Sequence, residues 1–161
     1  MRMTGLFLAA AAIVAAPAMA QPATSPADYV MKAGAGDLYE KTSSQTVLMT
    51  TKDPAVKKFA NMMVMDHNQS TAKVKAAAMK DGLKPKPPML MPDQQQMISE
   101  LKTAKGADRD RLYISQQKTA HQKALALHSD YAQNGTAPAL KTAAAGITPV
   151  VQMHLDMLNK M

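Results

Sequence analysis

Residues 54–80 decide the fold, and they read PAVKKFANMMVMDHNQSTAKVKAAAMK. The segment opens on Asp53-Pro54, a pair typical of a helix N-cap followed by the first helical position. Inward-facing residues then recur at helical spacing, and strand-like alternation is absent. This stripe consists of Val56, Phe59, Met63, His67, Ser70 and Val74. A long helix with one such stripe has to bury it against other helices.

The same pattern recurs in three more segments. One runs from Ser25-Pro26 to about Thr50, one from about Asp108 to Asn134, and one from about Pro138 to Lys160, where Pro149 is expected to bend the helix. In the segment that starts at Ser25-Pro26, the stripe contains Tyr29, Ala33, Gly36, Glu40, Ser44 and Val47. In the segment from about Asp108, it contains Asp110, Ile114, Gln117, His121, Ala124 and His128. In the last segment, it contains Leu140, Ala144, Ile147, Val151, His154 and Leu158. Four amphipathic helices predict an all-α four-helix bundle.

The connection between the second and third long helices is unusually long. Gly82 and Pro85-Lys86-Pro87-Pro88 end the second helix, and a short helix is predicted from about Asp93 to Ala104. About 25 residues are enough to cross the bundle lengthwise, as in ferritin-like proteins. We therefore expect a ferritin-like four-helix bundle with a long connection that carries a short helix between helices 2 and 3, formed as a single domain by residues 21–161.

Residues 1–20 have the features of a cleaved signal peptide. Arg2 supplies the positive start, residues 6–16 are apolar, and Ala18-Met19-Ala20 is an A-x-A cleavage signature. The apolar run is shorter than the roughly 20 residues that a membrane span needs, and no later stretch qualifies. We expect cleavage after Ala20 and a bacterial protein that is periplasmic or secreted.

Composition excludes several classes of function. The chain has no cysteine, which excludes disulfides, thiolate metal sites and iron–sulfur clusters. Its formal charge is +7, but the basic residues are scattered and no aromatics lie between them, which argues against nucleic-acid binding. The charge indicates a solvated surface, with loose contact to an anionic envelope surface as the alternative. Motifs of phosphate-binding loops, serine hydrolases, zinc proteases and EF-hands are absent, so no catalytic residue is assigned. Partners and oligomeric state have no signature in the sequence.

Four polar residues on the inward stripes are predicted to lie at one height. Glu40 and His121 lie about 12 residues before a turn, and His67 and His154 about 15 after one, so each is roughly 18–22 Å from its turn. Three imidazoles and one carboxylate near mid-bundle predict a mononuclear site for copper, zinc or iron. Auxiliary residues are Asp66, which either orients His67 or faces water, and Met63 and Met157, whose thioethers would suit Cu(I).

Two alternatives to this site stay open. A ferritin-type di-iron centre needs Glu-x-x-His motifs, but the only glutamates, Glu40 and Glu100, do not precede a histidine by three, which argues against a di-iron oxidase. The other alternative is a polar core layer without metal, in which Glu40 accepts a hydrogen bond from His67 or His154. The twelve methionines of residues 21–161 would then fill gaps in a core poor in aromatics.

Two further polar residues are assigned structural roles. Asp110 is expected to be a first-turn residue that the helix dipole favours. His128 lies two turns from His121, about 10 Å along the helix, so it belongs to a separate polar core position or to the helix end.

Several motifs resemble an exported bacterial family known as domain of unknown function 4142. They are Phe59 through His67 (FANMMVMDH), Asp110-x-x-Tyr113 leading to His121, and Thr148-Pro149 with His154-Leu155. Glu40 also matches a glutamate of that family's first helix, and the resemblance spans about residues 26 to 158. This sequence departs from the family's pattern at Ala120, directly before His121, where the family often has an acidic residue.

The resemblance implies a ferritin-like four-helix bundle without a settled activity. We therefore expect an exported, non-catalytic bundle protein of the envelope or of stress responses. Periplasmic binding of a transition metal is the alternative.

Overall fold

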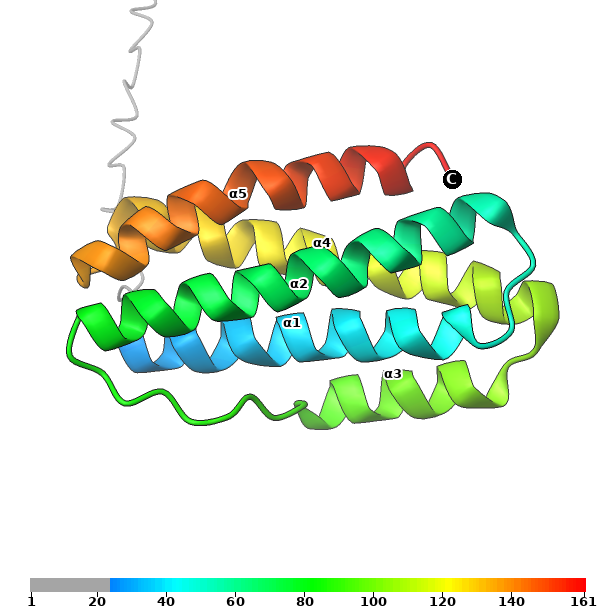
Figure 1. Cartoon of the computed structure of the whole chain (residues 1–161), viewed down its shortest axis with the longest axis horizontal. Coiled ribbons are helices and arrows are strands. Elements are labelled where there is room, and N and C mark those ends of the chain that lie inside the picture. Colours follow the sequence, from blue (N-terminus) through cyan, green and yellow to red (C-terminus); the bar gives the residue numbers. More distant parts are fainter. Residues whose placement is uncertain (1–23) are drawn as a thin grey trace, which may run out of the picture.

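The computed structural model describes residues 24–161 and shows four long helices side by side with a shorter fifth along one flank (Figure 1). The helices are α1 (Pro26–Leu48), α2 (Pro54–Lys80), α3 (Pro92–Thr103), α4 (Gly106–Asn134) and α5 (Pro138–Leu158). The predicted four-helix bundle is confirmed, and so is the short helix in the long connection. The signal peptide predicted for residues 1–20 lies outside the described residues.

The helices begin where their start signals stand. Ser25 and Asp53 cap α1 and α2, and the Asp53 carboxylate accepts hydrogen bonds from two backbone N–H groups at 2.7 and 3.1 Å. The ends differ slightly from the predictions. Helix α1 ends at Leu48 and α5 at Leu158, each two residues early, and α4 begins at Gly106, two residues before Asp108. Gly106 has a positive φ of 53°, which glycine adopts without strain.

The connection after α2 returns along the bundle, so α2 and α4 run in the same direction (Figure 1). Helices α1 and α2 form one antiparallel hairpin and α4 and α5 the other, and α1 packs on α4 while α2 packs on α5. Helix α3 lies against α1 and α4. This arrangement confirms the lengthwise crossover of a ferritin-like bundle. No helix in residues 24–161 is both long enough and apolar enough to cross a membrane.

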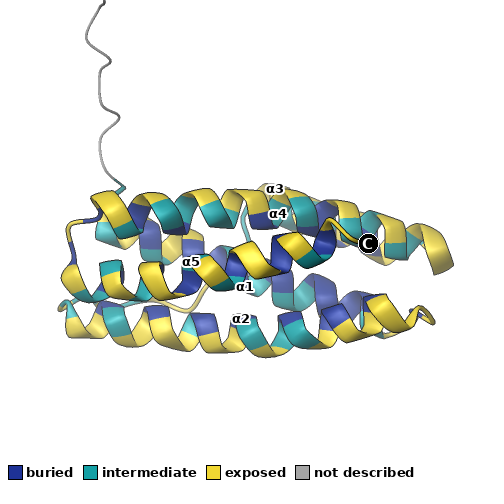
Figure 2. Cartoon of the chain, turned by 90° about the horizontal axis from the view of Figure 1, so that it is seen from above, coloured by how far each residue is buried: buried dark blue, intermediate teal, exposed yellow. Residues whose placement is uncertain are grey.

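The interior has three layers along the bundle axis. One apolar cluster is built around Tyr29, Tyr131 and Leu140, and the other around Phe59, Met63 and Leu158. Between them, at mid-bundle, the buried residues are polar, and Figure 2 shows that buried positions follow the inner faces of the helices. This polar layer consists of Asp37, Glu40, Ser43, Ser44, His67, Ser70, Gln116, Gln117, His121 and His154. A buried polar layer between two apolar clusters is stable when its donors and acceptors have partners.

Candidate metal centre

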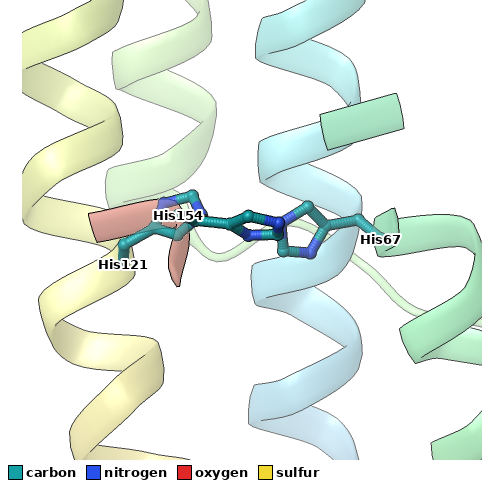
Figure 3. A group of neighbouring side chains, drawn as sticks. All are labelled: His67, His121 and His154. Carbon is teal, nitrogen blue, oxygen red and sulfur yellow. The ribbon is translucent and has the colours of Figure 1, made fainter. Parts of the chain in front are cut away.

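Three histidine rings from three helices converge at the centre of the polar layer (Figure 3). His67 comes from α2, His121 from α4 and His154 from α5, and each is almost fully buried. The ring centroids are 5.3, 5.6 and 5.8 Å apart, and one ring nitrogen from each residue lies within 4.8 Å of those of the other two. We call His67, His121 and His154 the histidine triad.

Hydrogen bonds fix which nitrogen of His121 carries its proton. Nδ1 lies 2.9 Å from the backbone carbonyl of Gln117, one turn earlier on α4, and a carbonyl can only accept. Nδ1 therefore donates and Nε2 keeps its lone pair. Burial, His67 and His154 lower the pKa of His121 to about 3, so the ring is neutral at physiological pH.

His154 has the opposite tautomer. Its Nε2 donates to the Asp66 carboxylate at 2.9 Å, which leaves the lone pair on Nδ1. That Nδ1 lies 3.3 Å from Nε2 of His121. Burial lowers the pKa of His154 despite Asp66, so this ring is neutral as well. Two lone pairs therefore face each other with no proton between them.

The third ring, His67, is held by two carboxylates of α1. Its Nδ1 lies 2.8 Å from Asp37 Oδ1 and 3.0 Å from Glu40 Oε2. Burial lowers the pKa of His67, but Glu40 and Asp37 outweigh that effect and raise it above its ordinary value. Its Nε2 is buried and has no hydrogen-bond partner among the described residues. The ring is thus oriented by its outer nitrogen, and its inner nitrogen is left unsatisfied.

Glu40 lies between two members of the triad. Its Oε1 is 3.2 Å from His121 Nδ1, but that N–H points at the Gln117 carbonyl, so Oε1 has no hydrogen-bond partner among the described residues. Burial raises the pKa of Glu40, and the neighbouring His67 opposes the shift. The carboxyl group is therefore a second buried group with spare capacity to accept.

An apolar wall closes one side of the triad. The Phe59 ring lies 6.3 Å from the His121 ring and 6.4 Å from the His154 ring. Met63 and Met157 pack in the same apolar cluster as Phe59, one helical turn from His67 and His154. On the outer side Asp66 is 31% exposed, so His154 lies close to solvent through its supporting carboxylate.

The structure corrects the expected partners of several residues. Asp66 neither orients His67 nor simply faces water, because it holds His154. Glu40 Oε2 lies 3.0 Å from His67 Nδ1, whose hydrogen bond goes to Asp37, and no contact between Glu40 and His154 is found among the described residues. Asp110 is not a first-turn residue, because α4 begins at Gly106 and its first turn contains Asp108; Asp110 instead accepts a hydrogen bond from Thr51 at 2.9 Å. His128 is a separate polar core residue, bonded to the Tyr29 hydroxyl at 2.9 Å.

Sequence reasoning missed Asp37. It is 4% exposed, binds His67, and also accepts from the Thr71 hydroxyl at 3.0 Å. The signal was available, because Asp37 precedes Glu40 by three residues and shares its helix face. The other missed contact, the Gln117 carbonyl, has no sequence signature, since any residue supplies a backbone carbonyl.

Comparisons with solved structures find the same fold in proteins of other families. A fragment of a DUF305 protein from Deinococcus radiodurans is 14% identical, with a TM-score of 0.71, over 86% of this chain and 97% of that one. CopM in its Cu(II)-bound form is 18% identical, with a TM-score of 0.73, over 86% and 96% of the two chains. CopM in its Cu(I)-bound form is 18% identical, with a TM-score of 0.70, over 84% and 94%. Such low identities show a shared fold alone.

At the level of sequence, no curated protein matches. A family profile, described as "Domain of unknown function (DUF4142)", matches residues 11–161. This match covers nearly the whole chain and includes the three motifs that carry the triad. The chain belongs to the DUF4142 family.

Proposed function

We propose that this chain binds a transition-metal ion through the three imidazoles of the histidine triad. The observation that carries the proposal is the hydrogen-bond geometry of the ring nitrogens. His121, His154 and His67 each direct one nitrogen at a supporting acceptor, and each turns the other nitrogen toward the centre. Metal-binding histidines have this arrangement, because the supporting acceptor fixes the tautomer and orients the lone pair.

A purely structural polar core accounts for these contacts less well. Such a core is stable when every buried donor and acceptor has a partner. Here two lone pairs oppose each other across 3.3 Å, and Nε2 of His67 has no partner among the described residues. Each unsatisfied buried group costs about 1–3 kcal/mol. A bound cation would turn these costs into favourable contacts.

The donor set narrows the choice of metal. Three imidazoles without a thiolate suit copper and zinc, and they also accept iron. CopM, whose fold this chain shares, is known in Cu(I)-bound and Cu(II)-bound forms, which makes copper the first metal to test. Met63 and Met157 are proposed as soft auxiliaries, since each lies one turn from a triad histidine. An exported protein, as residues 1–20 indicate, would meet copper in the periplasm.

The direct test is metal content and affinity of the mature chain, measured by elemental analysis and by competition titration with Cu(I), Cu(II) and Zn(II). We expect one ion held by the triad in the wild type and loss of that ion in His121→Ala. The matched control is His128→Ala, because His128 is also a buried histidine of α4 but bonds to Tyr29 outside the triad. Equal binding by both variants, or metal at background in all three proteins, would overturn the proposal.

A further inference from the structure

The two ring nitrogens of His67 point to different groups of side chains. On its Nε2 side lies the histidine triad, and on its Nδ1 side lie Asp37 and Glu40. One atom from each of Asp37, Glu40 and His67 lies within 4.8 Å of the other two, all three residues being buried. We call Asp37, Glu40 and the Nδ1 side of His67 the carboxylate set.

Among the described residues, the His67 ring is the one basic group that lies within ion-pair distance of both carboxylates of the carboxylate set. Asp37 and Glu40 stand one turn apart on α1, and a single ring N–H lies between them. Within residues 24–161 no lysine or arginine comes within ion-pair distance of either carboxylate. Glu40 is 1% exposed, and its Oε1 has no hydrogen-bond partner among the described residues. An unsatisfied carboxyl oxygen of Glu40 beside a second carboxylate on the same helix offers oxygen ligands to a cation.

A cleft of about 250 Å³ gives access to the carboxylate set. It lies between α1, the segment from Met91 to Met97 at the start of α3, and α4, and it is lined by Asp37, Glu40 and His67. His121 and His154 are not among the described residues that line it. A hydrated ion can thus reach the carboxylates from solvent, whereas the triad lies behind them.

We propose that the carboxylate set is a second metal site, and that the His67 imidazole bridges it to the triad. Two carboxylates and one imidazole form an oxygen-rich set that suits a divalent ion such as Zn²⁺, and it disfavours Cu(I). Binding there replaces the Nδ1 proton, which leaves to solvent. The bridge rests on the proposed function of the triad, but the second site stands on its own ligands.

Zn²⁺ alone is the probe, and the measurement is stoichiometry by calorimetry and by elemental analysis after gel filtration of the mature chain. We expect two ions in the wild type, one in Asp37→Asn, one in His121→Ala and none in His67→Ala. The amide oxygen of asparagine can still accept the His67 N–H, so Asp37→Asn should retain the triad. Asp28→Asn removes an exposed charge from the same helix and should leave two ions bound.

The outcomes separate this inference from the proposed function. Two ions in Asp37→Asn, or a single wild-type ion lost only in His121→Ala, would overturn the second site and leave the triad. A single ion lost in Asp37→Asn but kept in His121→Ala would overturn the triad and support the carboxylate set. No bound ion would overturn both. Glu40→Gln, which should lose the same ion as Asp37→Asn, decides the matter if Asp37→Asn fails to fold by circular dichroism.

Discussion

The three triad rings are chemically identical, and only their supporting acceptors make them different. The Gln117 carbonyl holds His121 by Nδ1, Asp66 holds His154 by Nε2, and Asp37 with Glu40 holds His67 by Nδ1. In each case the acceptor is placed by helix geometry and leaves the other nitrogen free. The arrangement therefore depends on residues that need not touch a metal.

Removing one supporting acceptor should weaken metal binding without removing a ligand. In Asp66→Ala, His154 loses the acceptor of its Nε2 proton, so it can adopt the other tautomer and turn away. Loss of such a partner typically costs 10- to 100-fold in metal affinity. Competition titration measures it, with Asp156→Ala, an exposed acidic residue of α5, as the control. A dissociation constant within twofold of the wild type would contradict the supporting role.

His128 should make the protein sensitive to acid independently of metal. Burial lowers the pKa of His128 to about 4 from its ordinary 6.5, while Asp37 raises it and His67 lowers it by smaller amounts. Between these values the unfolded chain binds more protons than the folded one, so the free energy of unfolding falls as the pH falls from 6.5 to 4. Each pKa unit is worth about 1.4 kcal/mol, so the loss is on the order of 3 kcal/mol.

The matched measurement is urea denaturation of the metal-free wild type and of His128→Gln at pH 7, 5.5 and 4.5. Glutamine cannot be protonated in this range and still offers an acceptor to the Tyr29 hydroxyl. We expect the stability difference between the two proteins to shift in favour of the variant as the pH falls. A difference independent of pH would mean that His128 titrates normally in the folded state.

The residues of the triad could be predicted from the sequence because the helical stripe and the residue type are both visible there. Their partners could not, since a hydrogen bond depends on helix rotation to within a few tens of degrees. Asp66 illustrates the difference: its position on the flank of α2 was clear, but the side chain bonds across to His154 on α5 and not to its neighbour His67.

At the scale of elements, the ends of the helices tie the two hairpins together. Asp81 ends α2 and also caps α5, because its carboxylate accepts from the Ala139 and Leu140 N–H groups at 3.0 and 2.8 Å. At the other end of the bundle, Arg109 of α4 donates to the Thr50 hydroxyl after α1 at 2.8 Å. Helix starts were predictable from Ser, Asp and Pro in adjacent positions, but a cap supplied from another helix has no local signature.

Asp81→Ala should therefore destabilise α5 although α5 itself is unchanged. Two backbone N–H groups lose their acceptor, and loss of an N-cap costs about 0.5–2 kcal/mol. Chemical denaturation of the metal-free protein measures this, and Asp130→Ala, whose carboxylate bonds only to the adjacent turn of its own helix through Asn134, is the control. Equal stability of the two variants would show that water replaces the cap at no cost.

At the scale of the whole molecule, the polar layer separates two apolar clusters that each hold the four helices together. Helix length and turn positions predicted the common height of Glu40, His67, His121 and His154, because rise per residue is fixed. Which residues meet within that layer depends on the pairing of α1 with α4 and of α2 with α5, and sequence periodicity carries no information about pairing.

A ligand that binds only the folded bundle should stabilise all of it, because the triad joins three of its four long helices. At a free metal concentration of 100 times Kd, the gain is about 2.7 kcal/mol. For a domain of this size that corresponds to a rise in Tm of roughly 5–10 °C. Thermal unfolding followed by circular dichroism, with and without metal and then with a chelator, measures the gain and its reversal. With Cu(I), an ion that the carboxylate set disfavours, the rise should be absent in His121→Ala and present in His128→Ala. An equal rise in both variants would mean that the metal stabilises the bundle from somewhere other than the triad.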